Sequence, residues 1–82
     1  MTQTRKTSFD IIREFLSDSK GRPKKGFEFG GAIEEHVSAR HISKGSTIAR
    51  NLREMAEEGE LETRYEKVNG RKYVLYRLRI RF

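Results

Sequence analysis

Cysteine and tryptophan are both absent from this chain of 82 residues. Without cysteine, the fold has no disulfides and no cysteine-ligated zinc site. No apolar run approaches the roughly 20 residues of a membrane-spanning helix. The opening MTQTRKTSFD is also not followed by the apolar segment of a secretory signal. We therefore expect a soluble, cytoplasmic protein with no membrane partner.

Apolar residues are scarce, at 34% of the chain, but they include five Phe and three Tyr. This content and length predict a single domain, residues 1–82, folded around a small core. No internal repeat or second domain is visible.

The net charge of +6 arises from 18 Lys and Arg against 12 acids. The excess of bases lies in residues 1–25 and 60–82, whereas the middle of the chain is neutral or slightly acidic. A basic balance of this kind favours a polyanionic partner, because phosphate contacts release condensed counterions. The simpler alternative is that the bases only keep a small domain soluble.

The first helix is predicted over residues 8–17, after a loose stretch at residues 1–6. Thr7 or Ser8 can cap it, and Asp10 lies in the first turn, where the helix dipole favours an anion. Its apolar residues recur at helical spacing and form one stripe: Phe9, Ile11, Ile12, Phe15 and Leu16.

The next segment, SDSKGRPKKG at residues 17–26, cannot continue the helix, because it holds two glycines and the only proline. A solvated, flexible loop is the simplest interpretation of its bases, with phosphate contact as the alternative: Lys20, Arg22, Lys24 and Lys25. Phe27 and Phe29 then bracket Glu28, which predicts a short extended segment that anchors the loop to the core.

Two further helices are predicted, over residues 32–40 and 44–58. Gly30 and Gly31 form a flexible junction before the second helix, whose inward residues are Ile33 and Val37. For the third helix, Ser43 is a suitable N-cap and Gly59 a left-handed C-terminal cap. The inward stripe of this third helix consists of Ile48, Leu52 and Met55.

The last third of the chain, residues 60–80, predicts a β-hairpin. Asn69-Gly70 stands between two alternating runs, and both residues tolerate the positive φ that a tight hairpin turn requires. This turn sets Val68 opposite Arg71, and it then predicts one apolar face from the pairs Tyr65–Val74, Thr63–Tyr76 and Leu61–Leu78. On the other face, opposite charges meet in the pairs Glu62–Arg77 and Glu60–Arg79.

The order of helix, loop, helix, tight turn, helix and hairpin resembles the winged helix-turn-helix family. SKGSTIARNLREMAEEGELE is similar to the segment where many bacterial and archaeal winged-helix regulators enter their recognition helix. The matching positions are Ser46, Thr47, Ile48, Arg50, Leu52, Met55 and Gly59, with Met where Leu is more usual. The resemblance covers residues 8–79. The loop at 17–26 is longer and more basic than in the tightest members, which leaves its role open.

The resemblance implies an α+β fold, in which a three-helix core precedes a C-terminal two-stranded hairpin, the wing. It also implies a small transcriptional regulator of prokaryotic, archaeal or viral type that binds double-stranded DNA. The helix 44–58 would enter the major groove, and the wing would contact the backbone or the minor groove.

Helical spacing sets the outward face of residues 44–58 opposite the apolar stripe. Its N-terminal half is basic and hydroxylic, whereas its C-terminal half is acidic, with Glu54, Glu57 and Glu58. Arg50 is the best candidate for a bidentate contact with guanine. The candidate DNA-binding residues of the helix and wing are Lys44, Ser46, Thr47, Arg50, Arg53, Lys67, Asn69, Arg71 and Lys72.

Other functions find less support. GST at residues 45–47 lacks the spacing and the preceding strand of a phosphate-binding loop. His36 and His41 stand five residues apart without cysteines, so surface or partly buried histidines explain them better than zinc ligands. We expect no metal, no cofactor and no enzymatic activity. Tyr65 and Tyr76 fall on the apolar hairpin face, where core positions are more typical than a platform for single strands.

Two alternatives remain open. Winged-helix domains also serve as protein-interaction modules in larger assemblies, and the same basic surface would allow RNA binding. The C-terminal LRIRF adds a hypothesis: Ile80 and Phe82 either cover the base of the first helix or form a homodimer contact that matches a palindromic operator.

Overall fold

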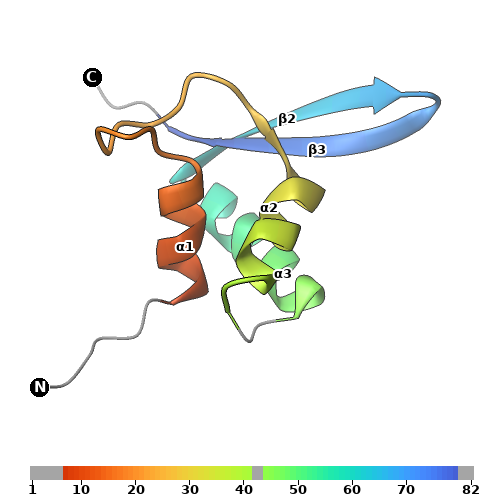
Figure 1. The fold of residues 1–82 in the computed structure, drawn as a ribbon. Helices are drawn as coiled ribbons and strands as arrows, with labels where there is room; N and C mark the ends of the chain where they lie inside the picture. Colours follow the sequence, from red (N-terminus) through yellow and green to blue (C-terminus); the bar gives the residue numbers. More distant parts are fainter. Residues whose placement is uncertain (1–6, 42–43, 80–82) are drawn as a thin grey trace, which may run out of the picture.

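The computed structural model describes residues 7–41 and 44–79 of the chain. Their elements are α1 (Ser8–Phe15), β1 (Glu28–Phe29), α2 (Gly30–Ser38), α3 (Gly45–Glu57), β2 (Leu61–Val68) and β3 (Arg71–Leu78). The helices pack on one face of an antiparallel sheet, and the β2–β3 hairpin extends beyond them (Figure 1). The predicted α+β class and the order of the predicted helices and hairpin are confirmed.

The sheet corrects the prediction of a two-stranded hairpin, because the described residues form three strands in the order β1-β3-β2. In β1, Glu28 lies opposite Tyr76 and Phe29 opposite Leu75. The FEF pattern predicted extended structure here, but two or three residues give no information about which strand they join. The pairing also places Phe29 away from the core, on the face of the sheet opposite the helices.

Helix α1 begins at Ser8, as predicted, with Thr7 as its N-cap. The Thr7 hydroxyl accepts a hydrogen bond from the Asp10 N–H, and the Asp10 carboxylate accepts one from the Thr7 N–H. The Thr7 N–H is the main cause that lowers the pKa of Asp10. The helix ends at Phe15, two residues early, and Ser17 forms a β-bridge with Pro23 instead.

The Thr7→Ala variant tests this cap. We expect it to lose about 1 kcal/mol of unfolding free energy, because a backbone N–H in the first turn loses its acceptor. Urea denaturation measures the loss, and Thr7→Ser, which keeps the hydroxyl, is the matched control. Equal stability of the alanine and serine variants would contradict the role of the hydroxyl.

The backbone of the loop at residues 17–26 is held by hydrogen bonds, which the prediction of a flexible loop did not include. The Asp18 carboxylate accepts the N–H groups of Lys20 and Arg22, at 2.8 and 2.9 Å. These bonds lower the pKa of Asp18, and the bond from Arg22 has the largest effect. The loop is therefore organised around Asp18, while the side chains of Lys20 and Arg22 stay exposed.

Helix α2 buries the predicted Ile33 and Val37 completely. It begins at Gly30, so the two glycines predicted as a junction form its first turn. A Cβ at Gly30 would lie 3.3 Å from the carbonyl oxygen of Val74, tighter than ordinary contact. Glycine at this position therefore permits the close approach of α2 to β3.

Helix α3 buries the predicted stripe of Ile48, Leu52 and Met55. It starts at Gly45 with Lys44 as its N-cap, one residue later than predicted. The predicted N-cap, Ser43, lies outside the described residues. At the other end, Gly59 has a φ of 83° directly after the C-cap residue Glu58, as predicted.

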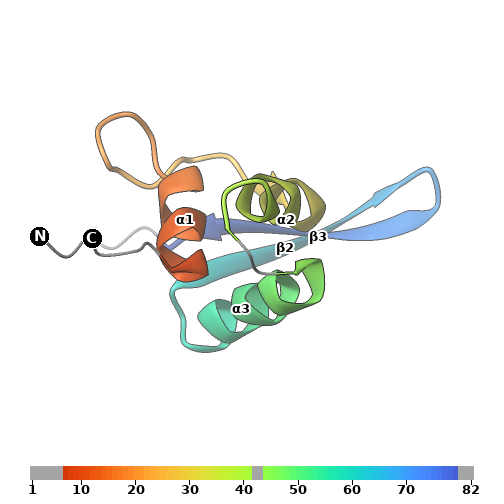
Figure 2. The same cartoon turned by 60° about the horizontal axis from the view of Figure 1, so that its bottom comes forward.

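Strands β2 and β3 pair in the register that the sequence predicts, from Val68–Arg71 to Leu61–Leu78. Asn69 and Gly70 form the turn with positive φ values of 52° and 80°. The core position predicted for Tyr76 is confirmed, whereas that for Tyr65 is wrong, because its side chain is 62% exposed. Figure 2 shows the reason: the distal half of the hairpin projects past the helices that would cover it.

The core lies between the helices and the inner face of the sheet, where α1 contributes Ile12 and Leu16 and the sheet contributes Leu61 and Tyr76. Burial is also the main cause that raises the pKa of Tyr76. Across residues 7–41 and 44–79, no helix has the length and apolar character needed to cross a bilayer.

Candidate nucleic-acid interface

The nine predicted DNA-binding residues are all exposed, and they lie in two groups. The first turn of α3 and the turn of the hairpin lie on the same side of the molecule, at the right in Figures 1 and 2. The α3 group comprises Lys44, Ser46, Thr47, Arg50 and Arg53, and the hairpin-tip group comprises Lys67, Asn69, Arg71 and Lys72.

The outward face of α3 follows from its buried stripe. Ser46, Arg50 and Arg53 recur at intervals of four and three residues, so they form one exposed row. The charge of Arg53 acts to lower the pKa of Tyr76, against the stronger effect of burial. The row lies on the exposed side of α3, opposite the buried stripe of this helix.

The arginines of the described chain fall into paired and unpaired groups. Carboxylates hold three of them in the ion pairs Arg13–Glu60, Arg64–Glu66 and Arg77–Glu62. Among residues 7–41 and 44–79, the ion pairs include none of the other arginines: Arg22, Arg40, Arg50, Arg53, Arg71 and Arg79. An ion pair fixes a guanidinium and offsets its charge, so the unpaired arginines are the ones available to an external anion.

The hairpin tip places two like charges directly opposite each other. Lys67 and Lys72 are register partners, and both are exposed. Lys72 Nζ also lies 4.6 Å from the centroid of the Tyr65 ring, which is on the same face of the hairpin. Opposed like charges destabilise a hairpin, and a bound phosphate would offset this repulsion.

Sequence reasoning missed two residues of this region. Tyr65 was predicted in the core, but its exposed ring belongs to the hairpin-tip group through its contact with Lys72. Asn51 was not singled out, although its amide donates a 2.6 Å hydrogen bond to the Ser8 hydroxyl in the interior. Its position four residues before Met55 already indicated the inner face of α3.

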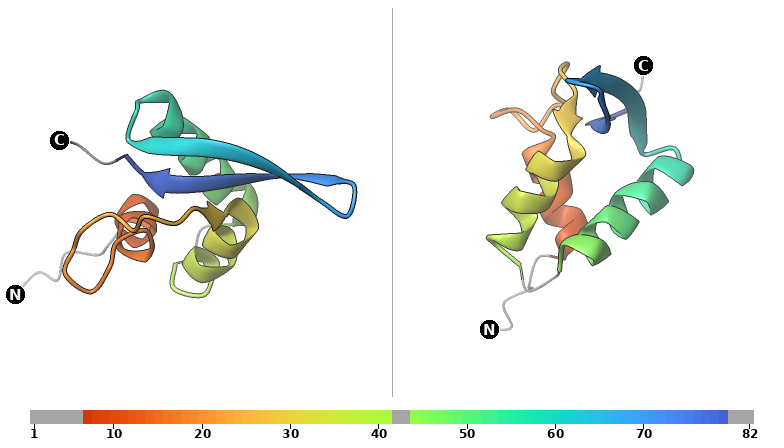
Figure 3. Two further views of the ribbon diagram at one scale, coloured as in Figure 1. Left: turned by 90° about the horizontal axis from the view of Figure 1, so that it is seen from above. Right: turned by 90° about the vertical axis from the view of Figure 1, so that its right-hand side faces the viewer.

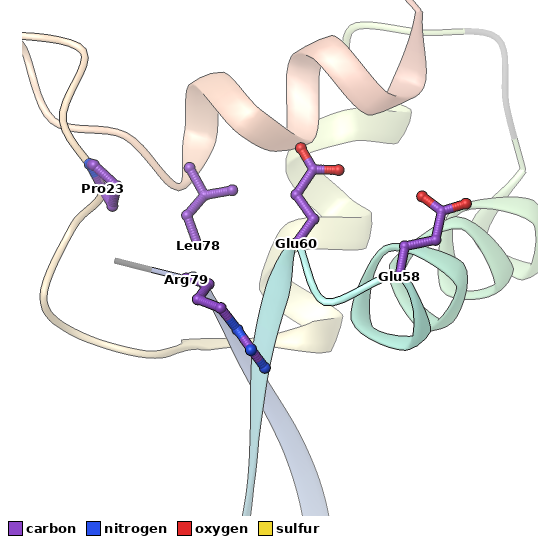
Figure 4. A pocket seen from close by; sticks show the side chains of 5 residues that line it. All are labelled: Pro23, Glu58, Glu60, Leu78 and Arg79. Atoms are coloured by element: carbon purple, nitrogen blue, oxygen red, sulfur yellow. The ribbon is translucent and has the colours of Figure 1, made fainter. Parts of the chain in front are cut away.

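A hollow of ≈ 370 Å³ lies at the opposite end of the molecule (Figure 4). It is lined by Pro23, Glu58, Glu60, Leu78 and Arg79. The Glu60 carboxylate binds Arg13 of α1, so this end ties α1 to the start of β2. Charges of both signs line the hollow, and it contains none of the predicted DNA-binding residues.

The ring of His36 lies on Phe15, with centroids 4.2 Å apart, and burial is the main cause that lowers its pKa. In the described ranges, no three side chains of the metal-binding types gather in a group that could hold a metal ion. The structure therefore assigns His36 to packing against α1. The predicted contact through the C-terminal residues 80–82 lies outside the described residues.

Comparisons with family models, with curated proteins and with solved structures give no match for this chain.

Proposed function

We propose that this chain is a winged helix-turn-helix domain that binds double-stranded DNA with sequence specificity, as a small transcriptional regulator. Helix α3 enters the major groove, Arg50 contacts a guanine edge, and the β2–β3 wing contacts the backbone or the minor groove. Ser46 and Thr47 contact bases or phosphates, and Lys44 contacts phosphate.

The distribution of unpaired cations carries this proposal. Arg13 and Arg77 pair with carboxylates of other segments and Arg64 pairs within β2, whereas three candidate contact residues have no carboxylate partner among the described residues: Arg50, Arg53 and Arg71. The first turn of α3 and the hairpin turn lie on the same side of the molecule (Figure 1), and both α3 and the hairpin tip carry exposed cations without a carboxylate partner in residues 7–41 and 44–79. Two separate elements thus present positive charge where a single polyanion could contact both.

Fluorescence titration tests the proposal with three probes: a labelled duplex pool, a single strand and a hairpin RNA, each at two salt concentrations. We expect the duplex to bind tightest, with an affinity that falls steeply as salt rises. Selection of bound duplexes from a random pool then measures specificity. A preference for hairpin RNA would replace DNA with RNA as the ligand, and no binding at low salt would refute the proposal.

If one of the opposed lysines is replaced, the unfolding free energy should rise while the affinity for DNA falls. Lys67→Gln should raise the unfolding free energy by about 0.2–1 kcal/mol, because it removes a like-charge pair. It should also weaken binding to all duplexes alike and reduce the salt slope by about 0.9, as for one lost phosphate contact. Urea denaturation and salt-dependent titration measure the two effects.

Lys20→Gln is the control for stability, since it removes the same charge from an exposed loop lysine outside the sheet. A stability gain of equal size in both variants would show that net charge, and not the Lys67–Lys72 pair, is responsible.

A further inference from the structure

The face of the sheet turned away from the helices has an apolar cluster of its own. Leu75 is only 4% exposed, yet it does not belong to the core between helices and sheet. Phe29 is its partner across the strands, and Tyr73 packs edge-on against Phe29 with ring centroids 5.8 Å apart. We call this surface the outer-sheet cluster, and it comprises Phe27, Phe29, Val68, Tyr73 and Leu75.

The outer-sheet cluster leaves apolar surface open to solvent. Phe29 is 41% exposed, Val68 40% and Tyr73 38%, although all three are large apolar or aromatic side chains. Phe29 lies opposite Leu75 and Val68 opposite Arg71. Tyr73 is two residues from both of these β3 partners, so strand alternation places all three exposed side chains on the same face. Contiguous exposed apolar surface on a small domain is typical of an interaction site.

Of the three arginines that β2 and β3 place on this face, two are ion-paired, and the third, Arg71, lies opposite Val68 at the hairpin turn and is in none of the ion pairs of the described residues. Arg64 pairs with Glu66 and Arg77 with Glu62, and both arginines also lie over the Phe27 ring, at 5.9 and 4.4 Å from its centroid. Their positive charge is thus already engaged, and the two carboxylates would repel phosphate. The outer-sheet cluster therefore favours a protein partner over a nucleic acid.

We propose that this partner is a second copy of the same chain. A two-fold axis would bring the same surface from each copy together, so that arginine and glutamate of one copy face glutamate and arginine of the other. The chain carries a net charge of +6, which opposes self-association through its cationic surfaces. Away from Arg71 at the hairpin turn, the outer-sheet cluster combines paired charges with exposed apolar surface, so it fits a copy of itself.

The size of the surface makes this contact weak. Strands of eight residues at about 3.3 Å per residue, in a sheet roughly 10–14 Å wide, offer on the order of 300 Å² per copy. A stable complex usually buries about 800 Å² per partner. We therefore expect a free protein that is mostly monomeric, with association at high concentration.

Two copies bound at neighbouring sites on one duplex would have a high local concentration, so that even a weak contact between them would form. This step rests on the proposed function, whereas the contact itself does not. The helices cover one face of the sheet (Figure 3), and the strand register places the outer-sheet cluster on the other face, so its use leaves the outward face of α3 open. The contact would then appear as cooperative DNA binding.

The contact can be tested without DNA, by recording amide NMR spectra of the full chain from micromolar to millimolar concentration. We expect concentration-dependent shifts at residues 27–29 and along the outer face of β2 and β3, with α3 unchanged. Tyr73→Ser and Val68→Ser should each abolish them, and both replace partly exposed side chains, so the fold can be checked in the same spectra. Spectra independent of concentration, or shifts centred on α3, would overturn the proposal.

A second measurement uses duplexes with one and with two adjacent sites. Tyr73→Ser should keep single-site affinity and lose a cooperativity of about 5- to 150-fold. Tyr65→Ser removes an exposed ring from the opposite face of the same hairpin, so it should lower single-site affinity and keep cooperativity. Independent binding at two sites by the native chain would refute cooperative use of the contact. Failure to bind any duplex would refute the proposed function, and the NMR series would still decide on the contact.

Discussion

Arg50→Ala is expected to cost about 1–3 kcal/mol of binding free energy on the preferred duplex and to relax base preference at one position. The guanidinium is exposed in the first half of α3 and has no carboxylate partner among the described residues, so its removal leaves the folded chain intact. Its effect should therefore fall on recognition and not on stability. Titration of the preferred duplex and of a random duplex measures the difference.

Arg79→Ala is the matched control for this prediction. Arg79 is also exposed, but it lines the hollow at the end of the sheet away from the hairpin turn (Figure 4). It should lower affinity for both duplexes slightly and alike, through net charge alone. If Arg50→Ala weakens both duplexes equally, Arg50 contacts phosphate and does not read a base.

The hairpin and the buried stripes of the helices could be predicted because each depends on residues close together in the sequence. Asn69-Gly70 determines the turn, and the turn determines every cross-strand pair down to Leu61–Leu78. Periodicity likewise identifies Ile48 and Leu52 as buried without knowledge of their partners.

The predictions of strand number and of burial are wrong where they depend on contacts between residues far apart in the sequence. The partner of β1 is β3, more than forty residues away, so neither the third strand nor the position of Phe29 on the outer face could be inferred from FEF. Tyr65 alternates correctly with Thr63 but lies beyond the reach of the helices, and the extent of the helices is a tertiary property. Alternation predicts a shared face, whereas burial requires something to cover that face.

The candidate site was predictable in position because exposure on α3 follows from the opposite buried stripe. Outside the hairpin, the sequence does not show which arginines form ion pairs with carboxylates. The hairpin register predicts Glu62 opposite Arg77. Arg13 and Arg53, by contrast, look equivalent along the chain, yet among the described residues only Arg13 has a carboxylate partner, Glu60, in a distant part of the sequence. The separation of paired from unpaired arginines therefore needed the fold.

Asn51→Ala is expected to cost about 1–3 kcal/mol of unfolding free energy. Asn51 and Ser8 are 7% and 6% exposed, and the amide of one donates to the hydroxyl of the other at 2.6 Å. Removal of either partner leaves a buried polar group without its hydrogen bond, which costs more than the bond itself contributes. Urea denaturation measures the loss.

A double-mutant cycle separates this hydrogen bond from the loss of packing. Ser8→Ala should destabilise by a similar amount, since the Asn51 amide is then left unsatisfied. The double variant should lose less than the sum of the two single losses, because no buried group then lacks a partner. Additive losses would mean that packing alone explains both variants.

Because the pair joins the first residue of α1 to the middle of α3, the bond also fixes the rotation of α3 that turns Arg50 and Arg53 outward. Asn51→Ala should therefore weaken duplex binding well below its unfolding temperature, with an unchanged salt slope, as no phosphate contact is removed.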